Sequence, residues 1–349
     1  MRRWDITADE MMKQYSKFWW CICGINIALF VGMILTTFFP LWETHADGVR
    51  FSASYIFSWL TNFLLIVVAC FFLKVYPENK SLKAASILWL IVNAMHAVTS
   101  PIIVSMPWEV YKQYLTVISG VQSSLQLMNM TVLLLIAYSA TSPKVRKAMH
   151  LVIGAILFQV WFNMIWTPLN EHLPYGWSNF YYMHHLYVIF TVLCGTAWAY
   201  LFAMLAMEED ALRNEEVVPL PENRGLGKMI LWGILTIGAY PMYIYTVMSQ
   251  EINRIGREDG KKTMNYLWVA WLLTWVTCLI YSFVWTHGYC NRVRDALAAR
   301  GIDYRFSARD FWLWSVLGIL IIVGPLVFVY KLMKASNLLA TSYNQQVAQ

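Results

Sequence analysis

Long apolar stretches alternate with short polar ones along almost the whole chain. A helix needs about 20 apolar residues to cross the ~30 Å hydrocarbon layer of a bilayer, because it rises 1.5 Å per residue. No Asp or Glu interrupts these stretches. The pattern therefore predicts an all-α fold, a polytopic transmembrane helical bundle of about nine spans. The expected spans are residues 18–40, 53–75, 84–104, 115–139, 149–167, 181–206, 229–248, 266–286 and 311–330.

Composition supports a membrane protein over a soluble one. The chain is 59% hydrophobic and 13% charged, whereas soluble domains average ~45–50% apolar and ~25% charged residues. The six cysteines lie in or beside apolar stretches without a CxxC pair, which favours reduced thiols over a disulfide framework. The net charge of +6 comes from short patches beside the spans, so we expect no nucleic-acid partner.

The distribution of Lys and Arg predicts the orientation of the chain. Alternate segments, starting with the N-terminus, hold 18 of the 26 basic residues. Basic loops stay in the cytoplasm, so we expect a cytoplasmic N-terminus and an external C-terminus. One basic cluster breaks this rule: Arg254, Arg257, Lys261 and Lys262. It indicates either that one late span is re-entrant or that the number of late spans is wrong. We expect a multi-pass protein of the bacterial inner membrane, with the lipid bilayer as its partner.

One polar stretch divides the chain into two membrane regions. It contains two acidic runs and a Pro-Leu-Pro sequence, and it is typical of a solvated loop. We predict a six-span transmembrane unit, an acidic cytoplasmic linker, and a three-span unit with amphipathic tails. Their bounds are residues 1–207, 208–228 and 229–349.

The C-terminal unit carries a weak repeat. Pro241 precedes Asn253 by twelve positions, and Pro325 precedes Asn337 by the same number. The sequence Thr236-Ile-Gly-Ala-Tyr-Pro-Met-Tyr-Ile-Tyr, followed by Gln-Glu-Ile-Asn-Arg-Ile, resembles an uncharacterised bacterial multi-pass membrane family, domain of unknown function 4234. The segment from Phe311 to Asn337 is similar to the closing part of that family. Over roughly residues 228–345, the resemblance implies a membrane domain and no particular activity; the first six spans resemble no family.

Catalytic motifs are missing from the sequence. It has no Gly-rich phosphate loop with Lys, no HExxH and no GxSxG. An ATPase, a zinc protease or a serine hydrolase is therefore not expected. We predict neither catalytic residues nor a metal site, and the absence of these motifs leans away from an enzyme.

Uncharged polar residues instead form stripes on several expected spans. They recur at spacings of three, four and seven residues, which place them on one face of a helix. Under the expected orientation these stripes lie in the outer half of the six-span unit, and we predict that they line a ligand-binding site. The predicted ligand-binding residues are Asn93, His96, Gln122, Gln126, Gln159, Asn163, Trp166, Tyr181, His184 and His185.

The stripes admit two interpretations. Buried amides must be hydrogen-bonded, so the stripes either bond adjacent helices together or line a polar pocket open to the outside. A third hypothesis gives His96 and His185 the role of axial haem ligands. Haem is the one cofactor that the sequence admits.

Three functional hypotheses follow. The first is a sensor or membrane-complex subunit that binds a small neutral or lipidic ligand, with a second membrane protein as a partner. The second is a carrier or channel for a small neutral or lipidic solute, although such proteins usually show two pseudo-symmetric halves. The third is a haem-binding redox protein. Sequence alone does not distinguish the three.

Overall fold

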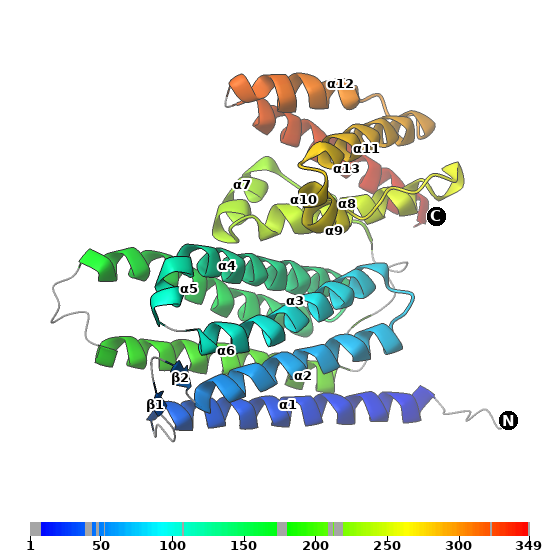
Figure 1. Cartoon of the computed structure of the whole chain (residues 1–349). Helices are drawn as coiled ribbons and strands as arrows, with labels where there is room; N and C mark the ends of the chain where they lie inside the picture. Colours follow the sequence, from blue (N-terminus) through cyan, green and yellow to red (C-terminus); the bar gives the residue numbers. More distant parts are fainter. Residues whose placement is uncertain are drawn as a thin grey trace. The chain divides into compact units, whose positions relative to one another are not determined.

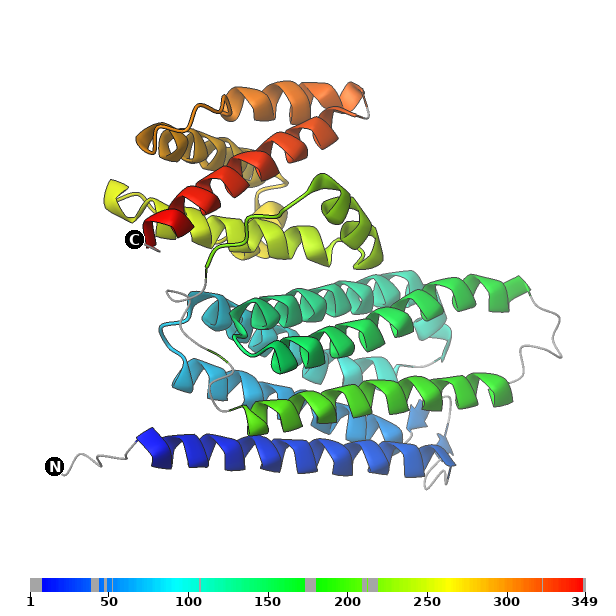
Figure 2. The ribbon, with the colours of Figure 1, turned by 180° about the vertical axis from the view of Figure 1, so that it is seen from behind.

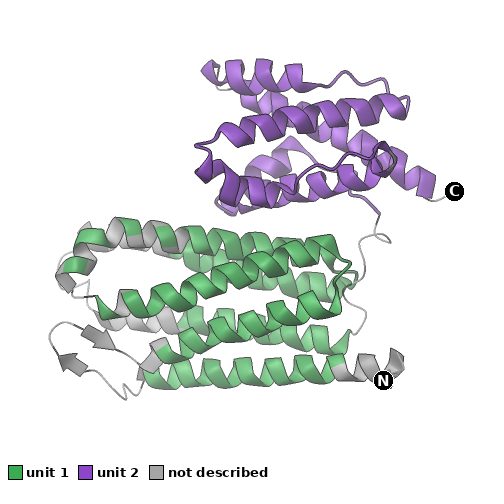
Figure 3. Cartoon of the chain, turned by 45° about the vertical axis from the view of Figure 1, so that its right-hand side comes forward, with its two compact units in different colours: residues 1–215 green, residues 216–349 purple. Residues whose placement is uncertain are grey.

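The computed structural model separates the chain into two compact units, residues 1–215 and 216–349 (Figure 3). The boundary falls inside the predicted linker, and each unit is described by itself. The structure describes residues 8–38, 44–46, 49–51, 53–106, 108–172, 180–208, 212, 219–321 and 323–347. In unit 1 the described side chains lie mainly in 15–36, 56–102, 124–162 and 189–208.

Unit 1 is a bundle of long helices in which each helix packs against its neighbour in the chain (Figure 1). The last helix also packs against the first, which closes the bundle into a ring; Figure 2 shows this pair from behind. A hairpin of β1 (Thr44–Ala46) and β2 (Val49–Phe51) follows the first helix. The helices are α1 (Ala8–Phe38), α2 (Ala53–Val75), α3 (Lys80–Ser105), α4 (Trp108–Ser139), α5 (Pro143–His172) and α6 (Phe180–Met207).

The predicted all-α, membrane-type fold is confirmed. Five helices among the described residues are long and apolar enough to cross a bilayer. The described apolar part of α4 covers only Ser124–Ser139. The count of nine spans is not confirmed. The five helices are Tyr15–Thr36, Ile56–Val75, Lys80–Ile102, Pro143–Phe162 and Ile189–Met207.

Polar side chains along α1 bond to the backbone of α6. The Ser16 hydroxyl donates to the carbonyl of Ala206 at 2.9 Å, and the Asn26 amide donates to the carbonyl of Gly195 at 3.3 Å. Ten residues separate the two donors on α1 and eleven separate the acceptors on α6, so the helices run antiparallel in a fixed register. Such bonds satisfy polar groups that hydrocarbon would leave unpaired.

Aromatic side chains fill the interior of unit 1. Trp19, Phe72, Trp89 and Phe202 are almost fully buried. Trp19 of α1 packs against Phe72 of α2 and Phe202 of α6, with ring centroids 5.5 and 6.1 Å apart. Trp89 of α3 stacks on Trp198 of α6 at 5.8 Å. Because these rings come from α1, α2, α3 and α6, they occupy the centre of the ring of helices.

Close packing of α1 on α6 depends on Gly195. A Cβ at this position would lie 2.2 Å from the ring of Phe30. We expect Gly195→Ala to destabilise unit 1 by about 1–3 kcal/mol, the usual cost of overpacking. Thermal unfolding of the purified protein in mild detergent measures this change. Gly24→Ala is the matched control, because nothing lies within 4 Å of a Cβ there. Equal unfolding midpoints for the two variants would contradict the predicted packing.

The described residues of unit 2 form three helical hairpins. In each, a short apolar helical arm leads through a tight turn into a longer helix with a polar end. Hairpin 1 consists of α7 (Leu226–Leu235) and α8 (Ala239–Ile255). Hairpin 2 consists of α9 (Tyr266–Trp268), η3 (Val269–Leu273) and α10 (Thr274–Val276), then α11 (Ile280–Ala299). Hairpin 3 consists of α12 (Ala308–Asp310), η4 (Phe311–Val316) and η5 (Leu317–Leu320), then α13 (Gly324–Val347).

The turns of hairpins 1 and 2 are built alike. The Thr236 hydroxyl accepts from the backbone N–H of Tyr240 at 2.8 Å, and the Thr277 hydroxyl accepts from that of Tyr281 at 3.0 Å. Each threonine also donates to a carbonyl four residues earlier. The two turns are therefore equivalent, with an offset of 41 residues in the sequence.

Both turns use left-handed backbone conformations. Gly238 has φ +94°, and the equivalent residue is Leu279 with φ +73°. Glycine adopts this conformation without a steric penalty, whereas leucine does so at a cost of about 1–2 kcal/mol. The backbone N–H of each residue bonds to a carbonyl five residues earlier, at 2.8 and 2.7 Å. These bonds leave the apolar turns with their backbone groups largely satisfied.

Each predicted late span folds back at its turn, so that its two ends meet. A straight span would hold its ends about 30 Å apart. In unit 2, residues that flank each predicted span are in direct polar contact instead. The contacting pairs are Arg224 with Glu251, Arg292 with Thr263, and Lys331 with Asp310.

Candidate functional site

The structure describes the side chains of four of the ten predicted ligand-binding residues. Asn93 and His96 lie on α3, Gln126 on α4 and Gln159 on α5. The predicted site as a whole stays a prediction. The side chains of Gln122, Asn163, Trp166, Tyr181, His184 and His185 lie outside the described part of the structure.

The described polar side chains in unit 1 mostly bond to neighbouring helical groups. Gln159 accepts a bond from the Cys194 thiol at 3.7 Å, across α5 and α6. The Asn93 amide donates to the carbonyl of Trp89 at 2.8 Å, within α3. Trp89 in turn donates to Asn129 of α4 at 3.1 Å. These contacts favour the interpretation in which polar residues hold the helices together.

Asn93 has one group that these contacts do not satisfy. Its side chain is 1% exposed, and its carbonyl oxygen has no hydrogen-bond partner among the described residues. His96 lies one turn further along α3 and is half-buried. Both residues belong to the predicted ligand-binding site, which stays a prediction.

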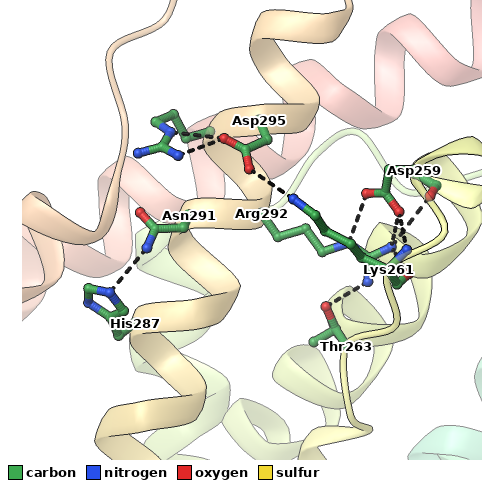
Figure 4. A network of polar contacts seen from close by, with 9 residues as sticks. Asp259, Lys261, Thr263, His287, Asn291, Arg292 and Asp295 are labelled. Atoms are coloured by element: carbon green, nitrogen blue, oxygen red, sulfur yellow. Dashed lines mark hydrogen bonds and ion pairs between the residues drawn. The ribbon is translucent and has the colours of Figure 1, made fainter.

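Unit 2 contains a buried arginine that organises the loop between hairpins 1 and 2. The Arg292 side chain is 6% exposed. Its guanidinium donates to the Lys261 carbonyl at 2.6 Å and to the Thr263 hydroxyl at 2.8 Å. It also donates to Asn253 and to the Asp259 carboxylate (Figure 4). One side chain of α11 thus satisfies several polar groups of this loop.

Two asparagines close the junctions between hairpins in the same manner. The Asn253 amide donates to the Thr263 carbonyl at 2.8 Å and accepts from the Thr263 N–H at 2.7 Å. The Asn337 amide donates to the Arg224 carbonyl at 2.7 Å and accepts from the Arg224 N–H at 3.1 Å. We call this reciprocal pair of bonds an asparagine clasp. The clasps join hairpin 1 to hairpin 2, and hairpin 3 to hairpin 1.

The third junction, between hairpins 2 and 3, has a different residue at the clasp position. The offset of 41 residues between the turns places Arg294 at the position equivalent to Asn253. Arg294 forms no such clasp; it pairs with the adjacent Asp295 at 2.7 Å. An open groove of about 580 Å³ lies at this junction.

The lining of this groove combines charged and apolar side chains. We call it the junction pocket. Arg294 and Arg309 contribute two positive charges, and Leu313 and Leu317 contribute apolar surface. Arg309 makes no ion pair among the described residues. The remaining lining residues are His287, Asn291, Ser307, Ala308 and Trp312.

His287 is held in a defined orientation beside the pocket. The Trp312 indole donates to His287 Nδ1 at 3.0 Å. The Asn291 amide lies 3.1 Å from His287 Nε2 (Figure 4). Because Nδ1 accepts a hydrogen bond, a neutral imidazole carries its proton on Nε2, and this N–H takes the carbonyl oxygen of the Asn291 amide as its acceptor. These bonds connect both walls of the pocket, since Trp312 belongs to hairpin 3 and His287 to hairpin 2.

A nucleophilic thiol is not available near this site. Cys290 is fully buried on α11, and burial raises the pKa of its thiol far above the ordinary value. The thiol therefore stays protonated at neutral pH, and only the thiolate is an effective nucleophile. No group of three or more His, Cys, Asp or Glu within the described residues has an arrangement that holds a metal ion.

Comparison with known proteins adds one assignment. Residues 224–295 match the family described as Domain of unknown function (DUF4234). The resemblance seen in the C-terminal sequence is therefore confirmed for this part of the chain. The DUF4234 match covers hairpins 1 and 2 together with the clasp between them. No curated protein and no solved structure matches the chain.

Sequence analysis did not identify the junction pocket. The sequence pattern predicts only amphipathic tails in this unit. The twelve-residue spacing that ends at Asn253 and Asn337 was the available signal, because both residues form clasps. The spacing does not show that residues 287–294 face residues 307–317. That proximity depends on how hairpins 2 and 3 pack.

Proposed function

We propose that this chain is a ligand-binding membrane protein, a sensor or complex subunit rather than an enzyme, and that it binds an acidic phospholipid in the junction pocket. One observation carries the proposal. Arg294 and Arg309 line the same groove as the apolar side chains of Leu313 and Leu317.

The pocket matches the chemistry of an anionic amphiphile. Guanidinium groups form strong, charge-assisted hydrogen bonds with phosphate oxygens. Trp312 presents an apolar ring beside these charges, as is common for tryptophan at the level of lipid headgroups. Asp310 pairs with Lys331, so its carboxylate is neutralised by a cation outside the site. Asp295 pairs with Lys261 and with Arg294. A bound phosphate therefore shares the Arg294 guanidinium with this carboxylate, and Arg309 supplies the second positive charge.

The expected setting of the protein fits this ligand. The apolar helices of unit 1 place the chain in a membrane. We propose the bacterial inner membrane, with the N-terminus in the cytoplasm, because the basic residues gather in alternate segments. Acidic phospholipids are then neighbours of the chain at all times. A pocket of modest affinity is sufficient to keep one lipid bound.

Substitution of both arginines tests the proposal. Arg294→Gln with Arg309→Gln removes two charge-assisted contacts, each worth about 1.5–3 kcal/mol. We expect affinity for phosphatidylglycerol to fall at least tenfold. Native mass spectrometry of the full chain in mild detergent, titrated with phosphatidylglycerol, measures the bound fraction. Phosphatidylcholine, which carries no net charge, should bind weakly to both proteins.

Arg305→Gln is the matched control, because Arg305 is exposed and does not line the pocket. This variant should bind phosphatidylglycerol like the unaltered chain. Inorganic phosphate at millimolar concentration should not displace the lipid, since the leucines contact only an acyl chain. Equal affinity of the double variant and the control for phosphatidylglycerol would refute the proposal.

Material that co-purifies with the protein tests the alternatives. An absorption spectrum of the protein in mild detergent detects haem, which the His96 and His185 hypothesis requires. Mass spectrometry of the same sample detects a lipid in stoichiometric amount, as the junction pocket requires. A second protein chain without any bound lipid would favour a subunit role in which the pocket has no ligand.

A further inference from the structure

We infer that the three hairpins of unit 2 are re-entrant: each enters the bilayer from the cytoplasmic side and returns to that side. The partner of their apolar tips is the acyl region of the cytoplasmic leaflet. The inference does not depend on the lipid proposed for the junction pocket.

The arms are too short to cross a membrane. Helix α7 has 10 residues and is about 15 Å long, half the ~30 Å thickness of the hydrocarbon. The first arm of hairpin 2 extends from Tyr266 to Val276 and is of similar length. Each arm then turns back. The depth that such a hairpin reaches corresponds to one leaflet.

Charge and exposure divide each hairpin into a polar base and an apolar tip. The tips expose large apolar side chains, for example Ile234 at 61%, Ile280 at 67% and Leu320 at 87%. No Asp, Glu, Lys or Arg occurs in residues 229–250, 263–291 or 311–330. Exposed apolar surface of this extent, bounded by charged residues, is typical of a membrane-embedded surface.

The turns are suited to hydrocarbon. A polypeptide turn inside a bilayer is stable only where its backbone groups find partners. Thr236 and Thr277 supply a hydroxyl acceptor to the turns of hairpins 1 and 2. In hairpin 3, the N–H of Ile321 bonds to the Gly318 carbonyl at 3.0 Å, and the N–H of Gly324 bonds to the Ile321 carbonyl. All three turns therefore carry internal hydrogen bonds.

The contacts at the bases put all the polar ends on one side. Arg224 precedes hairpin 1, and it pairs with Glu251 near the end of the same hairpin. The clasp of Asn337, at the end of hairpin 3, reaches the same Arg224. Arg254 donates to the hydroxyl of Tyr343 at 3.0 Å. Helices that crossed the bilayer would hold Arg224 on the opposite face from Glu251 and Asn337. Arg254 and Tyr343 share one face in either topology.

This topology removes the exception to the positive-inside rule. With α4 as the sixth crossing beside the five helices of sufficient length, unit 1 returns the chain to the side of its N-terminus, and re-entrant hairpins keep the rest of the chain there. Every Lys and Arg except Arg50 and Lys112 then lies on the cytoplasmic side. The basic loop at 254–262 agrees with the rule in this arrangement. The C-terminus is then cytoplasmic, the reverse of the expectation from nine spans.

Single-cysteine labelling tests the inference. Lys262→Cys and Gln345→Cys introduce the label at two exposed positions. Both positions lie outside the cell in the nine-span topology and in the cytoplasm in the re-entrant topology. A membrane-impermeant maleimide is applied to intact cells and to inverted membrane vesicles. Lys147→Cys reports the cytoplasmic side, Lys112→Cys reports the outside, and the chain without an added cysteine gives the background.

We expect positions 262 and 345 to be labelled only where position 147 is labelled. Labelling of either position in intact cells, alongside position 112, would overturn the inference. A tag after Gln349 gives a second measurement, because protease should remove it from inverted vesicles and spare it in intact cells. Leu320→Cys should stay unlabelled until detergent is added. Labelling at 320 in intact membranes from either side would show that the tip lies in water, and would also overturn it.

Discussion

Replacing Arg292 by leucine should destabilise unit 2 by about 3–5 kcal/mol, the cost of removing one partner from a buried ionic network. The guanidinium binds the Asp259 carboxylate, the Thr263 hydroxyl and the Lys261 carbonyl. Leucine leaves these groups without their donor and fills less of the space. We expect the thermal unfolding midpoint in detergent to fall by roughly 10 °C.

Two further variants make this prediction specific. Arg292→Lys keeps the charge but not the planar fork of donors, so its loss of stability should be intermediate. Arg305→Leu removes an exposed arginine and should change the midpoint little. If Arg292→Leu unfolds at the same temperature as Arg305→Leu, the network does not stabilise the loop.

Replacing Arg224 by methionine should have a similarly large effect. The side chains of Arg224 and Glu251 are only 4% and 6% exposed. Without Arg224, the Glu251 carboxylate stays buried without its cation, which costs about 3–5 kcal/mol. The double variant Arg224→Met with Glu251→Leu should recover most of this loss, because replacing both members of a buried pair by apolar residues is often neutral. Chemical or thermal unfolding of the four proteins gives the coupling energy.

An exposed ion pair provides the control for this cycle. Lys144 and Glu208 lie 2.8 Å apart, with side chains that are 69% and 30% exposed. Lys144→Met should cost less than about 1 kcal/mol, since water screens the pair. A double variant at 224 and 251 that is as unstable as Arg224→Met alone would show that the charge of Glu251 is not the cause.

The amino-acid sequence predicted the membrane character and most of unit 1. The apolar stretches there are long and free of acidic residues, so that helices and their approximate ends follow from composition and length. Five of the predicted spans coincide with apolar helices of sufficient length. The resemblance of the C-terminal part to DUF4234 was also visible in the residues, and it is confirmed over 224–295.

The last three predicted spans show where the hydropathy pattern was insufficient to predict the path of the chain. The residues from Met229 to Met248 are as apolar as a crossing helix, and hydropathy depends on the residue types alone. The chain turns back within this stretch because Thr236 and Gly238 form a hydrogen-bonded turn. The equivalent turn of hairpin 2 has Leu279 at the left-handed position, so no glycine marks this turn in the sequence.

The sequence by itself determined that the chain is helical, that it belongs in a membrane, and where its charged segments lie. Those properties depend on local composition, which a single sequence contains in full. Only the tertiary structure decided that Asn253 clasps Thr263, and that Arg294 and Arg309 line the same groove. Such contacts join residues that are distant along the chain. They depend on the packing of whole hairpins, and no local pattern of residues specifies that packing.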